Sequence, residues 1–301
     1  MSRMVKIATT SLLIDDKSRT PGIDVDRAVD LAEAAGKEGA DIVVLPELFD
    51  VYSIGRNDWL KYYGEEIPGE GPLQTRFSAI AKKYNMYVVI DIIETNGDKL
   101  HNTAVLYNRD GSYNGKYRKT HLAPGEEDVI TAGDDYPVFQ TDFGKVAMTI
   151  CMDIHFPELF RILALQGADI ILHPTMWLDY TGAYCDVCAC ARAIDNGIYM
   201  VTSHYVNVPF LAGRAMGHAV VIDPMGRVLA DTGHRPGITT ATVDLDDIYE
   251  YWAGGGTELK KRYPTLKDCY FKIRRPETYG ILTRPDEENE WKIENPVLYQ
   301  P

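Results

Sequence analysis

The sequence predicts an α/β fold, and three patterns in it carry that prediction. Short apolar runs of strand length alternate with segments whose apolar residues recur at helical spacing. Turn signals rich in Gly, Asn, Asp and Pro separate these runs. The third pattern is internal, because residues 39–46 (GADIVVLP) recur as 167–174 (GADIILHP). We expect two related helix–strand units in a pseudo-symmetric, two-layered core, although two buried strands can share composition by chance.

The first half of the chain supplies strands and helices in alternation. Its predicted strands are apolar and bounded by turn residues; they cover residues 5–13, 41–45, 86–93, 103–107 and 113–117. Its predicted helices carry apolar stripes over residues 25–35 and 73–84. The strand at 41–45 is continuously apolar after its first residue, as expected for a strand covered on both faces.

The second half repeats this alternation and ends in a polar tail. Its predicted strands cover residues 138–140, 145–150, 198–203 and 238–243, and the second repeat copy at 167–174 supplies another. One helix begins at Pro157 and an Ala-rich helix covers about 182–195. The end from Arg274 onward is polar and contains Pro, so it is either disordered or docked on a neighbour. We expect one large domain over 1–265 and a C-terminal extension over 266–301.

Composition limits the classes of protein. With 301 residues and 45% hydrophobic content, the chain can bury a substantial single core. The formal net charge is -13 and no stretch gathers Lys and Arg on one face, so nucleic acid and anionic membrane are poor partners. No run of about 18 apolar residues predicts a membrane span, and the N-terminal apolar run is too interrupted for a signal peptide. Five cysteines favour reduced thiols and a cytoplasmic protein.

Three reactive side chains follow predicted strands. Glu47 follows the strand at 41–45, Lys119 follows a hairpin strand, and Cys151 follows the strand at 145–150. A thiol needs a proton acceptor and a nearby cation to act as a nucleophile and to stabilise its adduct. Glu47 and Lys119 supply these two functions. Taken alone, Cys151 would be interpreted as a structural thiol, Glu47 as a loop carboxylate and Lys119 as a solvated lysine.

The segments around these residues resemble a known family. Residues 45–48 (LPEL), 117–122 (YRKTHL) and 151–158 (CMDIHFPE) look like the three signature blocks of the carbon–nitrogen hydrolase (nitrilase) superfamily, in the same order. Further similarity lies in residues 192–196, 217–224 and 274–279. The resemblance implies an αββα four-layer sandwich. It also implies that Glu47 is a general base, that Lys119 stabilises the oxyanion, and that Cys151 forms a thioester.

The same resemblance implies further site residues. Family members often carry a second glutamate shortly before a glycine, and Glu126, seven residues before Gly133, fits that spacing better than Glu127. The main-chain N–H of Met152 is expected to share the oxyanion with Lys119. No metal and no cofactor are required.

Three residues bear on the substrate. Asp153, two positions after Cys151, looks more like amidase and carbamoylase members than true nitrilases. His155 stands where amidase-like members often have arginine, so it either contacts substrate or caps and packs. Trp177 follows the second repeat's strand, where it walls a pocket or packs in the core. The expected reaction is hydrolysis of a small amide or N-carbamoyl substrate, releasing ammonia or an amine. The alternatives are a nitrilase and a non-hydrolytic acyl-transferring or binding relative.

Two other site interpretations are weaker. Cys185, Cys188 and Cys190 invite a zinc site, but no second Cys or His pair lies at structural-site spacing. His121 invites a Cys–His protease pairing, which would leave the Glu and Lys blocks unexplained.

Family members usually pair across helices beside the active site and lay C-terminal tails over the partner, so we expect at least a homodimer.

Overall fold

The computed structural model describes residues 2–20, 22–51, 64–177, 183–206, 217–247 and 257–284. The chain divides into two compact units, Met1–Tyr249 and Glu250–Pro301. The described part of the second unit holds helices α6 (Thr257–Arg262) and α7 (Leu266–Ile273). The Thr265 side chain caps α7 by accepting the Asp268 N–H. In these described segments, no helix combines the length and the apolar character that crossing a bilayer would need.

The first unit contains two sheets that are connected by one pair of parallel strands. The first sheet has the order β5-β4-β3-β2-β1-β12; its strands are β1 (Met4–Leu13), β2 (Ile42–Val44), β3 (Tyr87–Asn96), β4 (Lys99–Tyr107), β5 (Tyr113–Arg118) and β12 (Gly237–Asp244). The second has the order β6-β7-β8-β9-β10-β11; its strands are β6 (Val138–Gln140), β7 (Lys145–Met148), β8 (Ile170–Pro174), β9 (Tyr199–Val206), β10 (Val220–Ile222) and β11 (Val228–Asp231). Ser11–Leu13 of β1 pair with His204–Val206 of β9 and join the sheets.

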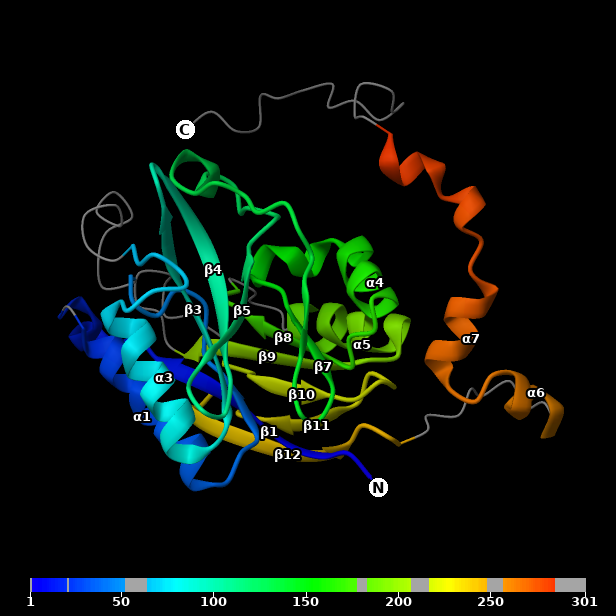
Figure 1. The fold of residues 1–301 in the computed structure, drawn as a ribbon, viewed down its shortest axis with the longest axis horizontal. Helices are drawn as coiled ribbons and strands as arrows, with labels where there is room; N and C mark the ends of the chain where they lie inside the picture. Colours follow the sequence, from blue (N-terminus) through cyan, green and yellow to red (C-terminus); the bar gives the residue numbers. More distant parts are fainter. Residues whose placement is uncertain are drawn as a thin grey trace. The chain divides into compact units, whose positions relative to one another are not determined.

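Side chains on alternate faces of each strand build the layers. On the first sheet, Val43 and Val88 pack against helices α1 (Ile23–Lys37) and α3 (Pro72–Tyr84). Their neighbours Ile42, Val44 and Val89 face the other way and form one core with residues of β7, β8 and β9. Helices α4 (Pro157–Leu165) and α5 (Cys190–Asn196) lie across the second sheet from α1 and α3 (Figure 1). The four layers therefore confirm the αββα sandwich.

The internal repeat corresponds to two equivalent units. In the first repeat, the Asp41 side chain accepts the N–H of Lys6 at 2.8 Å, and the Asp41 N–H donates to the Lys6 carbonyl at 2.7 Å. In the second, Asp169 makes the same pair of bonds with Lys145, at 3.0 and 2.8 Å. Each aspartate thus pins the start of a central parallel strand, β2 or β8. The pseudo-symmetry expected from the sequence is confirmed.

Two elements differ from the expectation. The strand predicted to run directly into Cys151 ends at Met148, because the Ile150 N–H donates to the Asp153 side chain at 2.8 Å rather than to a strand. Cys151–His155 then form a short 3₁₀ helix, η4. The Ala-rich helix begins with a π-helical stretch, Tyr184–Ala189, before α5.

Candidate active site

Glu47, Lys119 and Glu126 meet in the interior of the first unit. The Lys119 ammonium donates to Glu47 Oε1 and to Glu126 Oε2, each at 2.8 Å. All three side chains are almost fully buried, with exposed fractions of 2% for Lys119, 4% for Glu47 and 6% for Glu126. Buried charges of this kind persist only when paired and hydrogen-bonded. The three residues that the sequence singled out separately are therefore one buried ion cluster.

Asn102 completes this cluster and was not predicted from the sequence. Its side-chain amide donates to Glu47 Oε1 at 3.0 Å and to Glu126 Oε1 at 3.1 Å. Asn102 also accepts the Lys119 N–H on its main-chain carbonyl, at 2.9 Å. A signal was present in the sequence, since His101, Asn102 and Thr103 are three polar residues in succession between the apolar residues of strand β4.

Cys151 lies beside the cluster on a strained turn. Its φ is 41°, a left-handed conformation that non-glycine residues rarely adopt. Leu48, directly after Glu47, has a φ of 49°. Such outliers, costing about 1–3 kcal/mol each, concentrate at functional sites. The Met176 N–H donates to Glu47 Oε2 at 3.0 Å and also favours the thiolate of Cys151, so one donor serves both residues.

The charges in this cluster oppose one another. Burial alone would lower the pKa of Lys119, but Glu47, the Cys151 sulfur and Glu126 together raise that pKa well above its usual value, so the ammonium stays charged. Burial and the Glu47 carboxylate raise the pKa of Cys151, and Lys119 offsets this only in part. The resting thiol is therefore protonated, and it needs a base to become a nucleophile.

Asp153 braces the Cys151 turn from inside the protein. It is fully buried, and its Oδ2 accepts the Tyr117 hydroxyl at 2.7 Å in addition to the Ile150 N–H. Its Oδ1 contacts the His121 ring nitrogen at 2.8 Å. These contacts favour a role in holding the turn over the expected contact with substrate. They also give His121 a carboxylate partner, and the ring stacks on Phe156 with centroids 3.8 Å apart.

Three further predicted residues surround Cys151. Met152 is the second residue of η4, a position at which a main-chain N–H has no intrahelical acceptor. Trp177 is 2% exposed, and its indole N–H donates to the Cys151 carbonyl at 3.4 Å. His155 is exposed and meets the Tyr184 ring edge-on at 4.8 Å. Partial burial and Arg192 lower the pKa of His155, which favours its neutral form.

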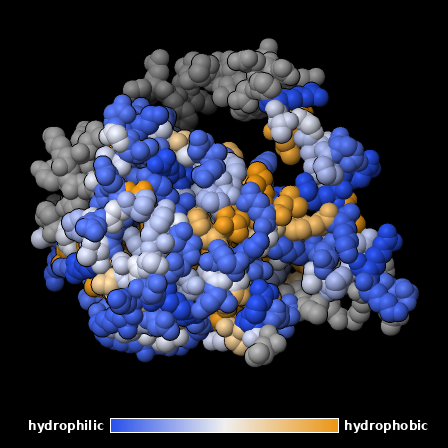
Figure 2. Space-filling model, in the orientation of Figure 1, coloured by the Kyte–Doolittle hydropathy of each residue, from blue (hydrophilic) through white to orange (hydrophobic). Residues whose placement is uncertain are grey.

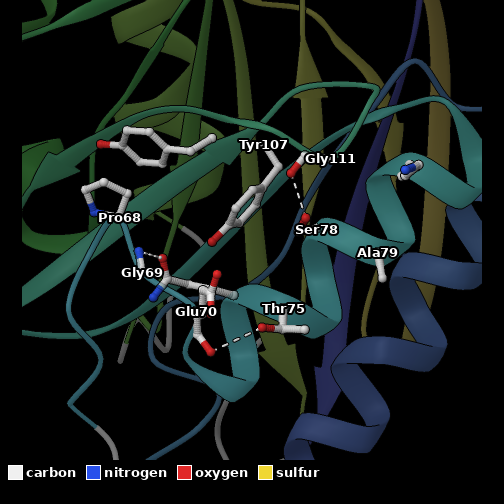
Figure 3. A pocket seen from close by; sticks show the side chains of 11 residues that line it. Pro68, Gly69, Glu70, Thr75, Ser78, Ala79, Tyr107 and Gly111 are labelled. Carbon is white, nitrogen blue, oxygen red and sulfur yellow. Dashed lines mark hydrogen bonds between the residues drawn. The ribbon is translucent and has the colours of Figure 1, made fainter.

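A cavity of about 550 Å³ lies elsewhere on the first unit, between α3 and the β4–β5 hairpin (Figure 3). Two polar side chains along it bond within the protein, since Thr75 donates to the Glu70 carbonyl and Ser78 to the carbonyl of Gly111. The hydroxyl of Tyr107, which also lines the cavity, has no hydrogen-bond partner among the described residues. None of the four residues predicted to be catalytic lines this cavity. Over the described residues, no group of three or more His, Cys, Asp or Glu side chains is placed to hold a metal ion.

Comparison with known proteins decides the family. The model of the carbon–nitrogen hydrolase family matches residues 17–252 of this sequence. The chain belongs to the carbon–nitrogen hydrolase family. Omega-amidase NIT2 of Xenopus tropicalis is 33% identical over 277 residues, covering 88% of this hydrolase and 93% of the relative. Omega-amidase NIT2 of Mus musculus is 33% identical over 272 residues, covering 87% of this hydrolase and 92% of the relative.

Solved structures share the fold of this hydrolase. The crystal structure of Nit3 from Saccharomyces cerevisiae, a member of branch 10 of the nitrilase superfamily, superposes with a TM-score of 0.72 at 30% identity and covers 80% of this chain and 90% of Nit3. A mutant of the amidase from Nesterenkonia sp. AN1 superposes with a TM-score of 0.75 at 21% identity and covers 92% of this chain and 97% of that amidase. The sandwich is therefore the nitrilase fold.

Proposed function

We propose that this hydrolase cleaves the C–N bond of a small amide through a thioester on Cys151. The observation that carries the proposal is the buried Lys119, which bridges Glu47 and Glu126 at 2.8 Å each and interacts electrostatically with the Cys151 sulfur. A proton acceptor, a fixed cation and a thiol are the groups that nucleophilic acyl transfer requires.

Acylation begins with the neutral thiol. Glu47 takes the Cys151 proton as the sulfur attacks the carbonyl carbon, and the C–S bond forms. The carbonyl oxygen becomes an oxyanion, which the Lys119 ammonium and the Met152 N–H stabilise. The tetrahedral adduct collapses when the C–N bond breaks and Glu47 returns its proton to the departing ammonia or amine. The products of this half-reaction are a thioester and a neutral amine.

Deacylation uses the same groups. Glu47 removes a proton from a water molecule, whose oxygen attacks the thioester carbon. The second oxyanion meets the same donors. The C–S bond then breaks, Cys151 regains the proton, and the carboxylic acid leaves. Glu126 does not exchange protons in this scheme; it holds the Lys119 ammonium in place through a second hydrogen bond.

The substrate class is proposed from the relatives and from the site. Two relatives are named omega-amidases, which favours carboxamides of small acids as first substrates. N-carbamoyl compounds form a second class, because they present the same carbonyl next to a nitrogen leaving group. His155 and Trp177 are proposed to contact the acyl part of the substrate beside Cys151.

Ammonia release tests this function. Purified enzyme is given omega-amides, simple carboxamides, N-carbamoyl amino acids and nitriles, with Cys151→Ala as the matched control. Turnover of an amide or carbamoyl compound that Cys151→Ala abolishes, together with a mass increase on Cys151 equal to the acyl group, supports the proposal. Turnover that survives in Cys151→Ala rules out the proposed nucleophile.

We also propose that the hydrolase works as at least a homodimer. Exposed apolar side chains gather between η4 and α4, on α4 and on the π-helix: Phe156 at 38%, Ile162 at 37%, Leu165 at 41% and Val187 at 62%. Figure 2 shows apolar surface around the place of α4. A second copy covering this face would remove it from water. The structure describes all five cysteines and none of them is in a disulfide, which supports a reducing, cytoplasmic setting. We propose that the 266–301 extension also contacts the partner subunit.

A further inference from the structure

Asp91 is a buried acid in the middle of an apolar strand. In β3 the residues from Tyr87 to Ile93 are otherwise apolar or aromatic, and Asp91 itself is 0% exposed. A carboxyl group is costly to bury unless its hydrogen bonds repay the loss of water. The proposed mechanism gives Asp91 no step, so its contacts have to account for its presence.

The contact of Asp91 is with the residue after Glu47. Its Oδ1 accepts the N–H of Leu48 at 3.0 Å. Leu48 is the residue with a φ of 49°, and it is 2% exposed. Without this acceptor the buried N–H would be unpaired, and the turn would be free to relax toward an ordinary φ. Such a rotation next to Glu47 would redirect the Glu47 side chain.

Two other buried side chains hold the same turn from the opposite strand. Ser203 donates to the Leu45 carbonyl at 2.7 Å, and the Tyr205 hydroxyl donates to the Glu47 carbonyl. Both come from β9, whereas Asp91 comes from β3. The turn of residues 45–48 is therefore held by hydrogen bonds from both β3 and β9.

We propose that Asp91 is a positioning residue, which holds Leu48 in its left-handed conformation and so aims the Glu47 carboxylate at Lys119 and Cys151. The proposal rests on the proposed function of Glu47 as general base. An uncharged acceptor suits this place, since a further negative charge would compete with Glu47 for Lys119.

The surroundings of Asp91 agree with an uncharged group. Burial and the Glu47 carboxylate raise the pKa of Asp91 well above its usual range. Asp50 adds to this effect, and the Leu48 N–H and Lys119 oppose it. Among the described residues, Asp91 Oδ2 has no hydrogen-bond partner that would favour the ionised form. Asparagine, which keeps an uncharged oxygen acceptor, is therefore a faithful replacement.

The rate at which iodoacetamide alkylates Cys151 tests this without a known substrate. The sulfur bonds to the methylene carbon, iodide leaves, and the thiol proton passes to Glu47. Mass spectrometry of the Cys151 peptide at pH 7 separates this reaction from that of the other cysteines. We expect Glu47→Gln and Asp91→Leu each to slow alkylation about tenfold or more, and Asp91→Asn to stay within about threefold of wild type. Thr10→Val is the matched control, because it removes a buried bond to the Val44 carbonyl of 2.9 Å outside the turn; it should react at the wild-type rate.

The outcomes distinguish the two proposals. An unchanged rate in Glu47→Gln overturns the role of Glu47 and the role of Asp91 with it. A slow Glu47→Gln with a fast Asp91→Leu overturns only the positioning role. An Asp91→Asn enzyme that reacts about tenfold or more slowly than wild type overturns the uncharged acceptor. This test compares Asp91→Asn with wild type only, so it stands even if Asp91→Leu does not fold. For the amide substrate, Asp91→Leu should lower kcat about tenfold while KM stays within about twofold, and Asp91→Asn should restore kcat.

Discussion

Replacing Lys119 with methionine perturbs two functions of one side chain. The change keeps the length of the stem and removes an ammonium that donates to Glu47 and Glu126 at 2.8 Å each. Breaking a buried ion pair by removing one partner costs about 3–5 kcal/mol. Because two carboxylates lose their partner here, we expect a loss at the upper end of that range. Losing one oxyanion donor should also lower kcat/KM about 100- to 1000-fold.

A double variant separates these two losses. Adding Glu126→Gln to Lys119→Met removes one of the two facing carboxylates and should recover about 1–2 kcal/mol of unfolding free energy, without recovering activity. Urea denaturation followed by circular dichroism measures the first quantity, and ammonia release measures the second. A Lys119→Met enzyme that keeps more than about a tenth of wild-type kcat/KM would refute the oxyanion role. A double variant less stable than Lys119→Met would refute the charge argument.

Three further variants test other parts of the structure. Burial raises the pKa of Asp50 to about 8, so the folded protein holds this proton while the unfolded chain releases it near 3.8, and stability falls by about 1.4 kcal/mol per pH unit as pH rises between those values. The difference in unfolding free energy between Asp50→Asn and wild type, measured by urea denaturation, should therefore favour the variant by about 2 kcal/mol more at pH 7.5 than at pH 6. An equal difference at both pH values would contradict the burial effect. Asn102→Leu removes the donor shared by Glu47 and Glu126 and should lower kcat/KM about 10- to 100-fold in ammonia release, so a wild-type value would exclude a functional role for that donor. Deleting residues 274–301 should reduce the oligomer seen by gel filtration, and an unchanged elution volume would remove the extension from the interface.

The sequence predicted the layers of this fold because burial on both faces leaves a strong pattern. The run from Ile42 to Val44 is apolar at every position, since one face packs on α1 and α3 while the other packs on the second sheet. The repeat of residues 39–46 at 167–174 was visible in the sequence because both copies have the same place in the fold. Each copy follows a helix, carries an aspartate that bonds to the neighbouring strand, and enters a central strand. Strand ends were less predictable, since the end of β7 depends on the Asp153 side chain, which comes later in the chain.

The candidate site was predictable only where a residue stood in a recognisable block or at a spacing typical of the family. Glu47 and Lys119 stand in blocks and Glu126 at such a spacing; the three lie together, although the sequence gives no distance between them. Asn102 and Asp91 were missed because each stands inside a strand, where a polar residue signals burial without naming its partner. Their partners come from turns 55 and 43 residues away along the chain. Such pairings depend on the register of β3 with β4 and on the path of the 45–48 turn.

The charge balance of the cluster fixes the order of events in the proposed mechanism. Two carboxylates and one ammonium already leave the buried site with one excess negative charge, so a preformed thiolate on Cys151 would add a second. The raised pKa of Cys151 expresses this cost. Proton transfer to Glu47 must therefore accompany the formation of the C–S bond, when the new charge moves onto the carbonyl oxygen beside Lys119. Glu47 is then protonated at the moment when the leaving nitrogen needs a proton, and one carboxylate serves both steps.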